Sequence, residues 1–144
     1  MFVILLCLQP EIGPRLLLRR GKKNKIRLID LARLSCILGR DVCSALIGVH
    51  AWTGCDSVSA FTGQGKVNAL NLIRTNDVFR DTFSLLGKDW SVPDTVFATI
   101  EEFTCRMYSR SAKSTTVNSL RYEMFCSKNM YAVRRQGMVR KTEI

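Results

Sequence analysis

The order of its hydrophobic patterns constrains this 144-residue chain most, because β-type segments come first and helical patterns follow. Residues 2–8 are consecutive apolar residues, rich in β-formers and followed by Gln9 and Pro10, which is typical of a buried strand. Residues 15–20 and 26–29 form two shorter strand patterns that are separated by a polar turn. This order predicts a mostly helical α/β fold with a short sheet of about three strands.

Helical periodicity covers most of the chain after these strands. Asp30 can cap a helix over residues 31–38, since its carboxylate can accept a hydrogen bond from a first-turn amide. Gly39 ends that helix, and Asp41 is expected to cap the next one. The other expected helices run from Lys66 to Arg74, from Asp77 to Leu86, from a capping Ser91 to Tyr108, and from a capping Thr115 or Thr116 to about Cys126. We therefore expect five or six helices after the strands.

The apolar segment at residues 2–8 also bears on possible partners. It is too short to span a bilayer, and it lacks the basic start and small-residue cleavage site of a signal peptide. A strand that is apolar on both faces needs cover on both faces, yet this one would begin at the second residue. We therefore expect no membrane partner, and we expect either preceding chain or a partner protein to cover the strand.

The charge balance favours a polyanionic partner. Lys and Arg number 22 against 12 Asp and Glu, which gives a formal net charge of +10. Much of this charge lies in one strip with a single acid, Asp30. The strip holds Arg15, Arg19, Arg20, Lys22, Lys23, Lys25, Arg27 and Arg33. An ordinary solvated hairpin is the alternative interpretation of the same residues.

The cysteine pattern indicates reduced thiols rather than a zinc site. Six cysteines occur without a C-x-x-C pair, and His50 is the one histidine in the sequence. A structural zinc site needs clustered Cys or His ligands. Buried thiols of this kind favour an intracellular location, which includes the nucleus.

One stretch has the composition of an anion-binding loop. Gly63 and Gly65 precede a helical pattern, and glycine allows a partner to approach the backbone closely. First-turn amides attract a phosphate, and Lys66 adds a positive charge beside them. Asp56 follows an apolar helix, where it can present a carboxylate at a cleft rim. The structural alternatives are turn glycines and a helix-capping aspartate.

Together these residues resemble a segment of the flap endonuclease and XPG nucleases, a branch of the PIN-like superfamily. The matching residues are Gly54, Asp56, Gly63, Gly65, Lys66 and Ala69, and the resemblance covers residues 2–75. It implies a partial PIN-like domain at residues 1–75 that includes a helix–hairpin–helix-type segment. A helical extension at 76–127 and a basic, flexible tail at 128–144 would follow. Residues 46–56, 101–105 and 120–122 also resemble a group of uncharacterised animal proteins derived from mobile elements, and this resemblance supplies a relationship without an established activity.

The chain departs from the nuclease pattern in its acidic residues. The family holds divalent metals such as Mg²⁺ or Mn²⁺ with several carboxylates, and a metal-bound water attacks the phosphodiester. The family's Asp-x-Asp pair lies just before the strand that matches residues 2–8, and only Met1 occupies that place here. Asp56 is therefore the one family acid that can be carried over, as a candidate ligand of an incomplete metal site.

The resemblance thus implies a remnant that binds the DNA backbone without catalysis. Its expected contacts are Gly63, Gly65, Lys66, Arg19, Arg20, Lys22, Lys23 and Lys25. Three alternatives stay open: a competent metal-dependent nuclease completed by acids from a longer product or a partner, a protein-interaction module, and a mobile-element fragment without a selected function.

Overall fold

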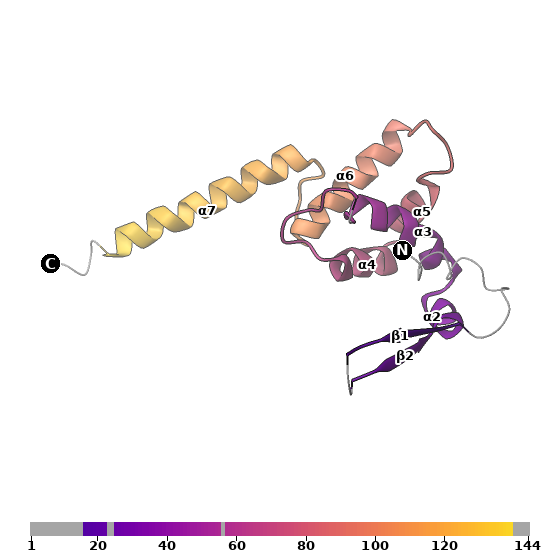
Figure 1. The fold of residues 1–144 in the computed structure, drawn as a ribbon. Coiled ribbons are helices and arrows are strands. Elements are labelled where there is room, and N and C mark those ends of the chain that lie inside the picture. The colour runs from indigo at the N-terminus through magenta and orange to yellow at the C-terminus, as the bar shows by residue number, and fades with distance from the viewer. Residues whose placement is uncertain (1–15, 23–24, 56, 140–144) are drawn as a thin grey trace.

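A β-hairpin and a body of packed helices make up the part of the chain that the structure describes (Figure 1). The computed structural model describes residues 16–22, 25–55 and 57–139, with only the backbone described for 129–139. The elements are β1 (Leu17–Arg20), β2 (Arg27–Asp30), α2 (Leu31–Leu38), α3 (Arg40–Trp52), α4 (Lys66–Thr75), α5 (Asp77–Leu85), α6 (Asp94–Tyr108) and α7 (Val117–Val139). These elements confirm the prediction of a mostly helical fold with a small sheet.

β1 and β2 form an antiparallel two-stranded sheet, with Leu18 opposite Ile29 and Arg20 opposite Arg27. Both strands were expected from the sequence, with bounds that differ by one or two residues. The third expected strand, at residues 2–8, lies outside the described residues. Leu18 and Ile29 are half-buried, and β2 leads directly into α2, so the hairpin is joined to the helical body at one end.

The hydrophobic core lies among α3, α4, α5 and α6. Phe103 of α6 is fully buried, and its ring lies 4.6 Å from Phe83 and 5.4 Å from Phe79, centroid to centroid. Ala45 of α3 and Ile73 of α4 are also fully buried in this cluster. The apolar stripes expected on these helices therefore meet in one core, which leaves the hairpin outside it.

The helix starts agree with the sequence at Asp30 and differ at two other positions. The Asp30 carboxylate accepts a hydrogen bond from the Arg33 amide at 3.0 Å, so the predicted cap is confirmed. Asp41 is not a cap: Gly39 bends the chain so sharply that α3 begins at Arg40, and Asp41 lies within its first turn. Ser91 is not a cap either, because the extended Pro93 is the N-cap and α6 begins at Asp94.

The bend at Gly39 bears on membrane association as well. No single helix in the described part of the chain is long and apolar enough to cross a membrane. α2 and α3 together would satisfy length and composition, but their axes are bent by 100°.

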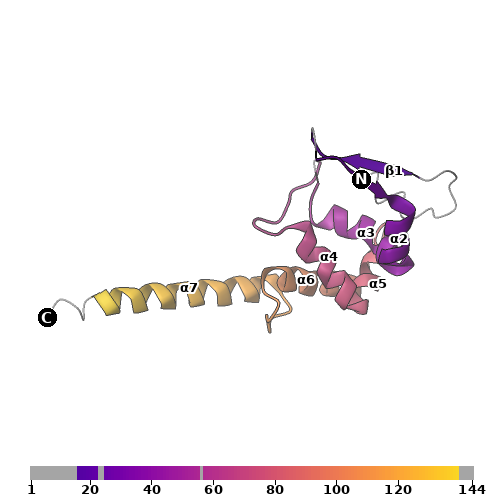
Figure 2. The same cartoon turned by 90° about the horizontal axis from the view of Figure 1, so that it is seen from below.

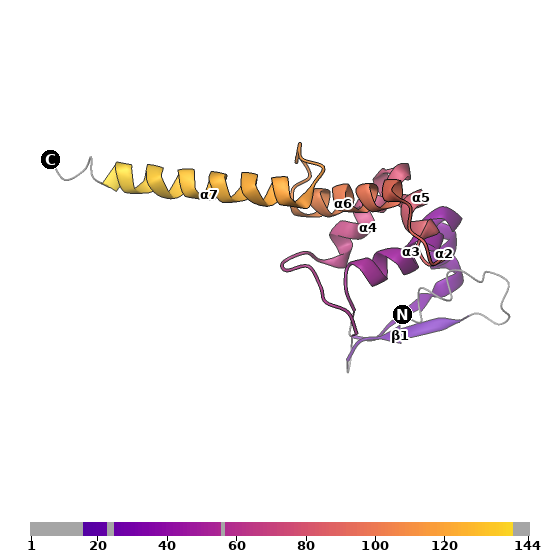
Figure 3. The ribbon, with the colours of Figure 1, turned by 90° about the horizontal axis from the view of Figure 1, so that it is seen from above.

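α7 is longer than the sequence pattern predicts. The predicted end near Cys126 is wrong, since the helix continues to Val139 and includes part of the stretch expected to be a loose tail. α7 begins directly after Thr116, one of the two predicted N-cap residues, whose carbonyl accepts from the Leu120 amide at 3.1 Å. The Thr116 hydroxyl donates to the Ser119 hydroxyl, and the carboxylate that bonds to the first helical amide, on Val117, belongs to Glu101 of α6 at 2.9 Å. From this attachment the helix projects away from the body (Figures 1–3).

Candidate nucleic-acid interface

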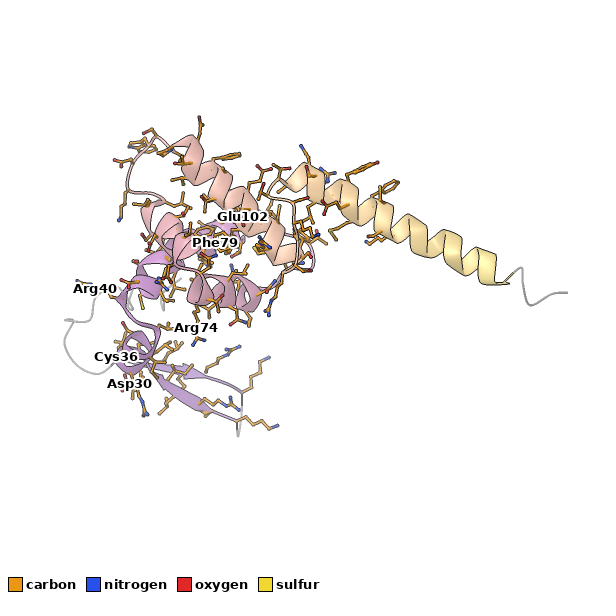
Figure 4. The ribbon with its side chains drawn as sticks, turned by 180° about the vertical axis from the view of Figure 1, so that it is seen from behind. Asp30, Cys36, Arg40, Arg74, Phe79 and Glu102 are labelled. Atoms are coloured by element: carbon orange, nitrogen blue, oxygen red, sulfur yellow. The ribbon has the colours of Figure 1, made fainter. Side chains whose placement is uncertain are left out.

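The hairpin carries a dense group of exposed cations. Its described cationic residues, all exposed, are Arg19, Arg20, Lys22, Lys25 and Arg27. Figure 4 shows the hairpin beyond the labelled Asp30 and Cys36, standing off the helical body. Lys23, which was predicted to belong to this group, lies outside the described residues.

These hairpin cations have no carboxylate partner among the described residues. The ion pairs found there are Arg80 with Asp77, at 2.8 Å, and Arg106 with Glu102, at 3.2 Å, and both lie in the helical body. Asp30, the one acid of the strip, is occupied in capping α2. The positive charge of the hairpin is therefore not neutralised by this part of the chain.

Two of the arginines lie directly opposite each other. Arg20 of β1 faces Arg27 of β2 across the ladder, and such pairs place their Cβ atoms about 4.5–5.5 Å apart. Like charges at this position destabilise a hairpin. An anion bound between the two side chains would relieve the repulsion.

The turn that joins the strands depends on Gly21. Its φ of 126° lies in a region that glycine adopts freely, and an added Cβ would stand 1.9 Å from the Lys25 carbonyl oxygen. The Lys25 amide donates to the Lys22 carbonyl at 3.2 Å. The backbone conformation of the turn thus determines the positions from which the Lys22 and Lys25 side chains extend.

The loop between α3 and α4 forms the second half of the predicted site. Gly54 opens it with a φ of 90°, and an added Cβ would lie 2.6 Å from the Ala60 backbone. Cys55 and Val58 then pair as a short bridge. The Ser57 hydroxyl and amide lower the pKa of the Cys55 thiol, because hydrogen bonds favour its charged form. Asp56, the candidate metal ligand, lies outside the described residues.

Lys66 spans this loop and holds its two ends together. Its ammonium donates to the Gly54 carbonyl, to the Thr53 hydroxyl at 3.1 Å and to the His50 carbonyl at 3.5 Å. These acceptors lie at the carboxyl end of α3, where the helix dipole favours a cation. The geometry therefore gives Lys66 a structural role, and its predicted contact with phosphate would compete with these acceptors.

Replacing Lys66 by Met should lower the free energy of unfolding by about 1–2 kcal/mol, since the α3 carbonyls would lose their cation. Urea unfolding followed by circular dichroism measures this change. Lys88→Met is the matched control, because Lys88 is exposed and its side chain has no bond among the described residues. Equal stability of the two variants would show that the Lys66 contacts contribute nothing to folding.

Gly63 and Gly65 leave the amino end of α4 open. Gly65 is the N-cap with a φ of −89°, and no side chain among the described residues caps the helix. An added Cβ at either glycine would meet no atom within 4 Å. The positive φ of Gly63, 73°, favours glycine at that position. Neither the backbone conformation nor the packing at position 65 requires a glycine, and the open space there lets a partner approach the backbone.

The hairpin and the α3–α4 loop lie on the same side of the helical body (Figures 2 and 3). Figure 1 shows that the hairpin lies below the level of this loop, so the two predicted groups of binding residues share a side of the body at different levels. Arg74, which sequence reasoning missed, projects from α4 on the side where the hairpin stands (Figure 4). Arg74 is exposed at the carboxyl end of α4. It lies far from the hairpin in the sequence, so no local pattern could predict that the two lie on the same side.

A metal centre receives no support from the described residues. They contain no group of three or more His, Cys, Asp or Glu side chains that could hold an ion. Of the nearby acids, Asp30 caps α2 and Asp41 lies in the first turn of α3. The described carboxylates therefore do not fit the divalent-metal site that the nuclease resemblance implies.

Comparison of this chain with models of known protein families, with curated proteins and with solved structures finds no match. The resemblance to the PIN-like nucleases therefore stays a prediction from the motif residues.

Proposed function

We propose that this chain binds nucleic acid through the phosphate backbone, without reading base sequence and without catalysis, as a remnant of a PIN-like nuclease. The observation that carries the proposal is the exposed hairpin, whose described cations have no carboxylate partner in the described part of the chain and whose Arg20 and Arg27 face each other. Phosphate contacts from arginine and lysine position a protein on a duplex but carry no sequence information.

The α3–α4 loop provides a second contact for the nucleic acid, on the same side of the body as the hairpin. The uncapped amino end of α4 offers backbone amides to an anion, and the open space at Gly65 allows a phosphate to approach them. Lys66 contributes there mainly by fixing the loop. No metal ion is part of this proposal.

Binding to duplexes of unrelated sequence at increasing salt tests the proposal. If the five described hairpin cations each contact a phosphate, the slope of log K against log salt is about −4.5. Affinity should then fall roughly 500-fold between about 50 and 200 mM salt, equally for every sequence. Binding that is indifferent to salt, or a strong preference for one duplex, would overturn the proposal in favour of a solvated hairpin or a sequence-specific site.

Replacing Gly21 by Ala tests the hairpin geometry without changing charge. The added Cβ cannot be accommodated at the present turn, so the tip and its lysines must move. We expect duplex affinity to fall at least several-fold while the core's unfolding transition stays in place, because Gly21 lies outside the core. Fluorescence anisotropy and thermal melting measure the two quantities. Unchanged affinity would mean that net charge alone, rather than the placed cations, attracts DNA.

A further inference from the structure

A second surface lies on the opposite part of the fold from the hairpin, where α7 leaves α6. The two helices diverge and enclose an open groove of about 930 Å³, which also reaches the end of α3. Leu120 is buried and Met124 packs beside it, so these residues attach α7 to α6. The groove is the part of this junction that the attachment leaves uncovered.

Large aromatic side chains line the groove without being needed to hold the helices together. Phe97 of α6 is 60% exposed, and Tyr122 and Phe125 of α7 are 70% and 64% exposed. Exposed aromatics gathered in one groove mark a binding surface rather than a core. Phe103 lies a few residues away on the same helix and is fully buried. One face of α6 therefore belongs to the core, and another face lines the groove.

Hydrogen bonds and ring contacts orient the side chains on the inner wall of the groove. The Trp52 ring nitrogen donates to the Thr104 hydroxyl at 3.0 Å, and that hydroxyl donates to the Ile100 carbonyl at 2.9 Å. The Phe61 ring lies 5.9 Å from the Trp52 ring and 6.4 Å from the Tyr108 ring. Flat side chains held in fixed orientations suit a flat ligand better than a flexible one.

Cations flank the exposed aromatic on α7. Arg121, Phe125 and Lys128 lie at positions i, i+4 and i+7, which is one face of a helix, and all three line the groove. Neither cation has an ion pair among the described residues. The alternation places positive charge on both sides of an aromatic ring, over about 10 Å of helix.

We propose that this groove binds the unpaired bases of single-stranded nucleic acid. A base stacks on Phe125 between Tyr122 and Phe97, and Arg121 and Lys128 contact the phosphates on either side. Proteins that bind single strands combine a cationic track with aromatic stacking in this way. The net charge of +10 favours such a polyanion and disfavours a second copy of this chain.

The groove goes beyond the proposed function because it recognises bases rather than the duplex backbone. It involves none of the hairpin residues, so the two proposals fail separately. Loss of base recognition would leave duplex binding and its salt dependence intact. Failure of the hairpin proposal would leave the groove's preference for bases intact.

The test compares two oligonucleotides that have the same phosphates. A thymidine oligonucleotide and an abasic oligonucleotide of equal length are titrated into the full chain at one salt concentration. The thymidine strand should bind tighter by roughly 5-fold to 150-fold for each stacked base. Equal affinities for the two strands would overturn the inference. Tighter binding of an acidic amphipathic peptide than of the thymidine strand in the groove would also overturn it.

Variants then locate the effect. Phe125→Ala should remove most of the difference between the two strands, whereas Trp90→Ala should preserve it. Trp90 is a matched control, since it is a fully exposed aromatic that does not line the groove. Arg121→Gln should weaken both strands equally, because it contacts phosphate. A melting curve of each variant confirms folding, and equal losses from Phe125→Ala and Trp90→Ala would place base binding elsewhere.

Discussion

Replacing Phe103 by Ala is expected to lower the free energy of unfolding by about 3–5 kcal/mol. Phe103 is fully buried, and its ring contacts both Phe79 and Phe83 of α5. Truncation would remove these contacts and leave a cavity where α5 and α6 meet. Most single domains of this size are stable by only about 5–15 kcal/mol, so this change would bring the chain close to unfolding at ordinary temperature.

Urea unfolding of Phe103→Ala beside Val67→Ala measures the effect. Val67 is 72% exposed on α4 and should cost little when truncated. A loss of less than about 1 kcal/mol for Phe103→Ala would contradict the described core, since truncating a buried Phe in a close-packed interior typically costs about 3–5 kcal/mol.

The sequence predicted the local elements well wherever a short-range rule decides the outcome. Helical periodicity predicted a helix after Gly39, and Ala45 and Val49 lie on the buried face of α3, which begins there. Asp30 was assigned as a cap because a carboxylate three residues before an amide can bond to it, and the structure has that bond. The two strands of the hairpin followed from their apolar runs around a polar turn.

The sequence failed where the outcome depends on distant contacts. Glu101 of α6 bonds to the first amide of α7, and no local pattern around Thr115 or Thr116 can show that. The same holds for Lys66, whose acceptors at Gly54 and Thr53 are more than ten residues away. The weak periodicity of α7 hid its length, because a helix that projects from the body needs no continuous apolar stripe.

The candidate site was predicted in part. The cations of the hairpin and the open glycines before α4 were identified from sequence, and the structure brings both to one side of the body. The groove between α6 and α7 was missed, since its aromatics come from three helices and a loop that are separated in sequence. Charge and composition therefore predict a kind of partner, whereas the surfaces become visible only in the fold.

Neutralising the hairpin tip should have the largest effect on nucleic-acid binding. The triple variant Arg20→Gln, Lys22→Gln and Lys25→Gln removes three expected phosphate contacts. At about 0.15 M salt this should weaken duplex binding roughly 10²-fold, and equally for all sequences. The fold should not suffer, because removing Arg20 relieves its repulsion with Arg27.

A matched control separates placed charge from net charge. Arg40→Gln, Lys88→Gln and Lys113→Gln remove the same number of cations from exposed positions away from the hairpin. This variant should lose only a few-fold in affinity, through the weaker long-range field. Equal losses in the two triple variants would show that DNA responds to overall charge and not to the hairpin.

The salt dependence of duplex binding in these three proteins tests most directly whether the hairpin is the phosphate-binding surface. The slope of log K against log salt should become less steep by about 2.7 in the hairpin variant. The control variant should keep the slope of the unmodified chain. Identical slopes in the unmodified chain and the hairpin variant would contradict the proposal, because they would mean that these cations release no counterions when DNA binds.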